Sequence, residues 1–103
     1  MTEIKYSDTA NSNILAFGIY AMLQSQSKEI GENVMNQIEN FCEKKITLVP
    51  QRGVKISDNP ETRRAPDKFG RTYYFEYYPE KDLVYILSIH KWDILDLDIV
   101  LEN

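Results

Sequence analysis

The sequence is poor in the residues that build covalent and metal-bound scaffolds. Its 103 residues include one cysteine, Cys42, and one histidine, His90. A single cysteine excludes an internal disulfide framework. One Cys and one His also supply too few ligands for a Cys/His zinc site within one chain. There is no glycine-rich phosphate loop, zinc-protease helix or nucleophile elbow. We therefore expect no metal, no cofactor and no catalytic residue of a classical type.

Long hydrophobic runs are also missing. No apolar stretch is long enough to cross a bilayer, and no charged-then-apolar leader opens the chain. With 43% apolar and 27% charged residues, the chain has enough apolar surface for a core and is not disordered as a whole. We expect one cytoplasmic domain over residues 1–103 that makes no contact with a membrane.

The net charge of −4 hides a division along the chain. Residues 44–71 carry eight Lys or Arg against three acids, a local charge of +5, and the rest of the chain carries −9. The overall negative sign argues against direct DNA binding, which relies on many phosphate contacts. The basic segment is either a solvated loop or a surface for a phosphate or an acidic protein face.

The first half of the chain has the patterns of a strand and two helices. Residues 4–6 alternate like a short strand, and Ser7, Asp8 or Thr9 can cap the helix that follows. Residues 13–24 repeat apolar side chains at three- and four-residue steps. A second helix is capped by Ser27, and the short connection predicts an antiparallel helical hairpin. The expected apolar stripes are Ile14, Leu15, Phe17, Gly18, Ala21 and Met22 in the first helix, and Ile30, Val34, Ile38, Phe41 and Cys42 in the second.

The second half predicts a loop followed by two strands. Residues 50–66 contain three prolines and much of the basic charge, which indicates a loop, with a strand beginning at Arg63. Residues 67–70 predict a tight turn. Residues 71–78 and 83–89 predict two strands joined by a turn at 79–82. The tail, 92–103, fits either a strand or a helix.

Three features of the chain are candidates for function. Arg63, Arg64 and Arg71 either grip a phosphate or carboxylate together or pair with the acids of the chain itself. His90, at the end of a strand, is either a general base or a ring held by a nearby backbone group. Cys42 lies on an apolar helical stripe, where a small core residue is more usual than a nucleophile.

The order of these elements resembles the ParE/RelE toxin superfamily of bacterial toxin–antitoxin modules. The resemblance runs from Ile4 to Asp93. It is carried by Arg63, six intervening residues, Gly-Arg-Thr-Tyr-Tyr-Phe-Glu-Tyr at 70–77, and Val-Tyr-Ile-Leu-Ser-Ile-His at 84–90. It implies an α+β fold in which an N-terminal strand and a helical hairpin pack on a small antiparallel sheet.

The superfamily has two main branches. RelE-like members are ribosome-dependent messenger RNA endonucleases, and Arg71 matches the arginine at the start of a strand in that branch. Their later Arg and Tyr have no counterpart, because neither residue follows His90. The sequence is more similar to the ParE branch, which inhibits DNA gyrase without being a nuclease. The alternatives are a RelE-like endonuclease and a non-toxic, immunity-like binding protein on the same scaffold.

The resemblance implies two partners, a cognate antitoxin and DNA gyrase, with a homodimer as a further option. Apolar residues of the tail, Leu95, Leu97 and Ile99, are candidates for antitoxin or dimer contact. The candidates for target binding are Arg63, Arg64, Arg71, His90, Lys91 and Trp92.

Overall fold

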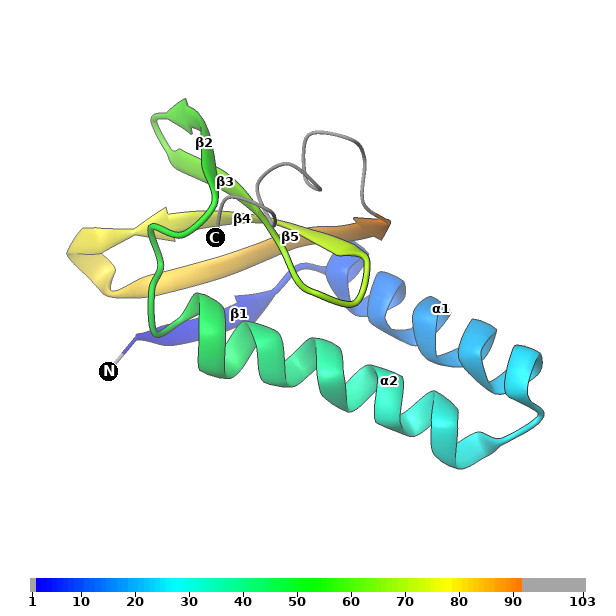
Figure 1. Cartoon of the computed structure of the whole chain (residues 1–103). Coiled ribbons are helices and arrows are strands. Elements are labelled where there is room, and N and C mark those ends of the chain that lie inside the picture. The colour runs from blue at the N-terminus through cyan, green and yellow to red at the C-terminus, as the bar shows by residue number, and fades with distance from the viewer. Residues whose placement is uncertain (1, 92–103) are drawn as a thin grey trace.

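Five strands form one sheet, and two helices lie on one face of it (Figure 1). The computed structural model describes residues 2–91. The helices are α1 (Asp8–Ser25) and α2 (Lys28–Phe41), and α2 continues into a π-helical turn, Cys42–Ile46. The strands are β1 (Glu3–Tyr6), β2 (Val54–Asp58), β3 (Glu61–Pro66), β4 (Arg71–Tyr78) and β5 (Leu83–Lys91).

The sheet has the strand order β1-β5-β4-β3-β2. β2 to β5 are antiparallel neighbours, whereas β1 pairs with β5 in parallel, so the sheet is mixed. The parallel pair is possible because the helical hairpin separates β1 from the later strands and carries the chain across the sheet. The predicted α+β architecture is confirmed, and the N-terminal strand belongs to the sheet.

Two serines begin the helices, as predicted. The Oγ of Ser7 accepts a hydrogen bond from the backbone N–H of Ala10 at 2.9 Å, and the Oγ of Ser27 accepts one from Ile30 at 3.3 Å. Each cap satisfies a backbone donor that the first helical turn leaves unpaired. Between the helices Gln26 adopts a left-handed conformation, with φ of 56°, which ends α1 and reverses the chain.

The helices approach each other closely at two glycines. A Cβ added to Gly31 would lie 2.7 Å from the backbone oxygen of Gly18, so the close contact requires that glycine have no side chain.

Two members of the predicted apolar stripes are exposed: Leu15 is 52% exposed and Ile30 is 45% exposed. This correction has two causes. The turn end of the hairpin extends beyond the sheet (Figure 1), and α1 carries apolar residues on its exposed side as well as on its buried side.

The core lies between the helices and the sheet. The Phe41 ring of α2 packs on the Tyr73 ring of β4 with centroids 4.5 Å apart. β5 is central, between β1 and β4, as its apolar sequence predicts. The buried apolar residues are Ala10, Ile14, Ile38, Cys42, Ile46, Ala65, Tyr73, Phe75, Val84, Ile86 and Ile89.

The loop predicted over residues 50–66 is wrong for most of its length. β2 and β3 form a hairpin there, and β3 begins at Glu61 rather than at Arg63. The sequence pattern misses it because all five residues of β2 are exposed and none signals a buried face. The other predicted strands and turns of residues 67–91 are confirmed. The prediction that the tail, 92–103, is either a strand or a helix concerns residues outside the described part of the chain. None of the described helices is both long enough and apolar enough to span a membrane.

Candidate functional site

The three candidate arginines occupy separate positions in the sheet. On β3, Arg63 lies opposite Phe75 and Arg64 lies opposite Tyr74. Arg71 begins β4, four residues before Phe75, which places it about 13 Å from that position along the strand. Arg64 also points to the opposite face from Arg63, because side chains alternate along a strand. The structure therefore does not bring the three side chains into one cluster.

Arg71 is held in a buried network at the turn between β3 and β4. Its Nε donates to Oδ2 of Asp67 at 2.9 Å, and an outer guanidinium nitrogen donates to Oε1 of Gln37 at 3.3 Å. The other carboxylate oxygen, Oδ1, accepts the backbone N–H groups of Phe69 and Arg71 at 2.8 and 3.1 Å. Arg71 is 6% exposed and Asp67 is 3% exposed. The sequence left two alternatives for the arginines, a joint grip on an external phosphate or carboxylate and pairing with the acids of the chain itself. For Arg71 the second alternative holds.

The same carboxylate fixes the ring of Tyr73. The tyrosine hydroxyl donates to Oδ2 of Asp67 at 2.7 Å. Burial raises the pKa of Tyr73 well above its usual value, and the neighbouring Asp67 charge raises it further. Asp67 therefore connects the turn, the start of β4 and a core ring, and its role is structural.

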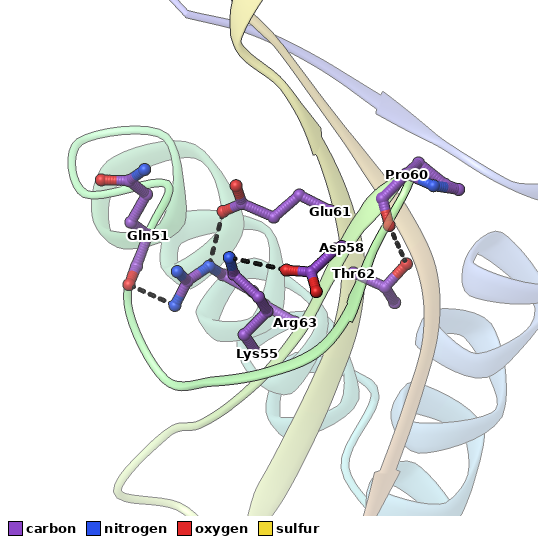
Figure 2. Close-up of polar contacts among 7 residues, drawn as sticks. All are labelled: Gln51, Lys55, Asp58, Pro60, Glu61, Thr62 and Arg63. Atoms are coloured by element: carbon purple, nitrogen blue, oxygen red, sulfur yellow. Dashed lines mark hydrogen bonds and ion pairs between the residues drawn. The ribbon is translucent and has the colours of Figure 1, made fainter.

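Arg63 also pairs inside the chain. Its Nε donates to Glu61 Oε2 at 2.7 Å, and an outer nitrogen donates to the backbone carbonyl of Gln51 at 2.7 Å (Figure 2). These bonds tie the segment before β2 to β3. Nearby, Lys55 Nζ donates to Asp58 Oδ1 at 3.0 Å, and both residues belong to β2 (Figure 2).

His90 and Lys91 are exposed at the end of β5. The His90 ring packs edge-on against Tyr74, with centroids 5.6 Å apart, and Lys91 Nζ lies 5.7 Å from the centre of the Tyr20 ring of α1. A shallow cavity of about 420 Å³ separates this strand end from α1. Its lining includes Asn13, Phe17, Tyr20, His90 and Lys91. Trp92, Leu95, Leu97 and Ile99 lie outside the described residues.

A second set of basic residues was not singled out individually from the sequence. Lys44, Lys45, Arg52 and Lys68 line one groove of about 1050 Å³ between the end of α2 and the turn after β3. The available signal was the positive charge of residues 44–71, which does not by itself say which side chains share a surface. Within residues 2–91, no group of His, Cys, Asp and Glu side chains is arranged to hold a metal ion.

The chain matches no protein-family model and no curated protein sequence. Its structure is similar to a chain of the RelBE2 toxin–antitoxin complex from Mycobacterium tuberculosis, with a TM-score of 0.63 and 13% identity over 88% of this chain and 98% of that one. It is also similar to a chain of the intact E. coli RelBE toxin–antitoxin complex (TM-score 0.57, 13% identity, 90% and 99% covered). The chromosomal ParDE system from P. aeruginosa gives a TM-score of 0.57 with 13% identity and 90% and 98% covered.

These likenesses confirm the predicted α+β fold, which the chain shares with structures from the RelBE and ParDE toxin–antitoxin systems. Both branches are represented among the similar structures at the same sequence identity. The overall likeness therefore does not choose between them, and the choice depends on individual residues.

Proposed function

We propose that this chain is the toxin of a type II toxin–antitoxin system, that a cognate antitoxin neutralises it, and that it acts by binding DNA gyrase. The shared fold supports the toxin role, because the similar structures include RelBE and ParDE assemblies. The preference for an inhibitor over a nuclease rests on Arg71.

The environment of Arg71 is unsuited to a catalytic arginine. A guanidinium that stabilises a phosphate transition state must point to where that charge develops. Arg71 instead points to Asp67 and Gln37 and is almost fully buried. Turning it outward would leave the Asp67 carboxylate buried without its partner, at a cost of about 3–5 kcal/mol. Residues 91–103 also contain no Arg or Tyr, which supports an inhibitor over a RelE-like nuclease.

The proposed gyrase contact centres on His90 and Lys91. Both side chains are exposed at the C-terminal end of β5, Lys91 beside Tyr20 of α1 and His90 beside Tyr74 of β4, and Trp92 follows them in sequence. Arg63 would support this surface by holding β3, and Arg71 by holding the start of β4. Exposed residues at a strand end can contact a partner without disturbing the core.

Two measurements test the proposal. Induced expression in bacteria should arrest growth with filaments and a DNA-damage response, and the purified chain should inhibit gyrase supercoiling in vitro. The double variant His90→Ala/Lys91→Ala should lose both effects while staying folded. Normal growth, or unimpaired supercoiling at a large excess of the chain, would contradict the proposal.

A RelE-like endonuclease is the second candidate, favoured by the position of Arg71 at the start of β4. Cleavage of messenger RNA in a translating extract, with gyrase unaffected, would establish it. Harmless expression together with tight capture of a basic toxin would instead favour the immunity-like alternative.

A further inference from the structure

The groove beneath β3 has an unusual combination of charge and apolar surface. It is about 1050 Å³ in volume and is bounded by the end of α2, the segment leading into β2, and the turn after β3. Its position follows from the fold, because α1 packs against β5 while α2 packs mainly against α1. α2 reaches the sheet through long side chains such as Phe41 and Gln37, so the inner side of β3 beyond them stays open.

The charge of the groove is one-sided. Four cations line it: Lys44, Lys45, Arg52 and Lys68. Among the described lining residues, Asp67 is the only acid. Its carboxylate is already bound by Arg71, Tyr73 and two backbone N–H groups. The groove is therefore locally positive on a chain whose net charge is −4. Cations gathered in a concave surface attract an anionic partner more strongly than the same charges spread over a flat one.

Three apolar residues of the lining are accessible to a partner. Phe69 is 56% exposed, Val49 is 46% exposed and Val54 is 37% exposed. Two cations lie near the Phe69 ring, with Lys68 Nζ 5.7 Å and the Arg71 guanidinium 5.3 Å from its centre. A contiguous exposed apolar surface rimmed by charge is typical of an interaction site.

We propose that this groove binds a peptide segment that carries both acidic and apolar side chains, supplied by a partner protein. Carboxylates would pair with the lysines and Arg52 at the rim, and apolar side chains would cover Val49, Val54 and Phe69. A single-stranded nucleic acid fits less well, because bases stack on aromatic faces and much of this lining is aliphatic. Pockets for small molecules usually measure ~300–1,000 Å³. The groove volume of about 1050 Å³ is at the upper limit of that range, which suits a peptide of several residues.

In the proposed function this segment belongs to the antitoxin, and to that extent the assignment depends on the toxin role. Binding itself does not require toxicity and is measured on the purified chain. The groove residues are a different set from Leu95, Leu97 and Ile99, which the sequence suggested for antitoxin contact and which lie outside the described residues. The groove cations come from three separate segments of the chain, so their proximity can be recognised only from the three-dimensional structure.

The first step of the test is a selection on the intact chain from a displayed library of random 12-residue peptides. The selected peptides should be enriched in Asp and Glu together with Leu, Ile, Val or Phe. A labelled copy of the best peptide then measures affinity by fluorescence polarisation, which should weaken as salt is raised because the charges at the rim are screened.

Charge reversal in the groove is compared with the same reversal elsewhere. Lys44→Glu/Lys45→Glu should weaken binding by roughly tenfold or more, because two attractive contacts become repulsive. Lys28→Glu/Lys81→Glu is the matched control, since it changes the net charge equally at exposed positions that do not line the groove. It should change the affinity by less than about twofold.

The apolar contribution has its own matched pair. Phe69→Ala should weaken binding by about tenfold, as expected for a central aromatic contact. Leu48 is 77% exposed but does not line the groove, so Leu48→Ala should leave binding unchanged.

Several outcomes would overturn the proposal. These are a selection that yields no binder, binders without acidic residues, or an affinity that Lys44→Glu/Lys45→Glu leaves intact. Failure of the acidic peptides combined with groove-dependent binding of a labelled oligouridine would assign the groove to nucleic acid instead. If expression of the unmodified chain caused no growth arrest but the peptide still bound, the toxin role would be contradicted and the groove assignment would remain supported.

Discussion

Arg71 and Asp67 form a buried ion pair four residues apart, with 2.9 Å between Nε and Oδ2, and this pair closes the turn that starts β4. The two side chains are 7% and 2% exposed, so the pair is poorly screened by solvent. Such a pair specifies one geometry for the turn, because each charge needs the other.

Asp67→Asn should therefore be strongly destabilising. It leaves the Arg71 charge buried without a counter-charge and weakens the Tyr73 hydrogen bond, and we expect a loss of about 3–5 kcal/mol. Urea unfolding measures this loss. Asp58→Asn is the control, since its exposed pair with Lys55 should contribute less than ~1 kcal/mol. A change below 1 kcal/mol in Asp67→Asn would mean that the pair is not coupled as described.

Substitutions of His90 and Arg71 should separate function from stability. His90→Ala removes an exposed ring at a strand end, so its unfolding free energy should change by less than about 1 kcal/mol while growth arrest is reduced. Arg71→Gln should lower stability by several kcal/mol, yet the fraction that remains folded should still inhibit gyrase. Thermal unfolding together with the supercoiling assay gives both quantities. Equal loss of activity per folded molecule in the two variants would argue that Arg71 contacts the target.

Gly31→Ala should destabilise the chain although alanine is the better helix former. Alanine gains ~1 kcal/mol in helix propensity. The added Cβ would lie 2.7 Å from the Gly18 backbone oxygen, and separating the helices costs ~1–3 kcal/mol. Asn33→Ala, at an exposed position of the same helix, should instead stabilise by a few tenths of a kcal/mol. Chemical unfolding of both variants compares the effects, and a stabilised Gly31→Ala would show that the helices can move apart cheaply.

Stability should fall steeply in alkaline solution. Burial raises the pKa of the Cys42 thiol to about 12, and burial likewise raises the pKa of Tyr6 and of Tyr73. These groups keep their protons longer in the folded chain than in the unfolded one. Their contribution is complete below the unfolded pKa, about 9 for the thiol, and is lost as the pH rises toward the folded pKa. Urea titrations at pH 7, 9 and 10 should show the decline.

Cys42→Ala isolates one part of that decline. Each such group contributes up to ~1.4 kcal/mol per pH unit, so the slope above pH 9 should become shallower by that amount. Cys42 should also resist thiol reagents in the native chain at neutral pH and react on unfolding, because it is fully buried. Rapid labelling of the native protein would contradict the burial on which both expectations rest.

The sequence by itself determined the elements whose signals are local. Ser7 and Ser27 cap helices because a hydroxyl needs only the next turn of backbone. The strands predicted over 71–78 and 83–89 follow from aromatic and apolar runs, and in the structure the second of them continues to Lys91. Only the tertiary structure decided the features that depend on neighbours. β2 is a strand because β3 lies beside it, although its own residues are exposed. Arg71 became a structural residue because the fold buries it against Asp67 and Gln37. The groove cations became one surface because α2, the segment before β2 and the turn after β3 converge, and no local pattern along a chain can report that convergence.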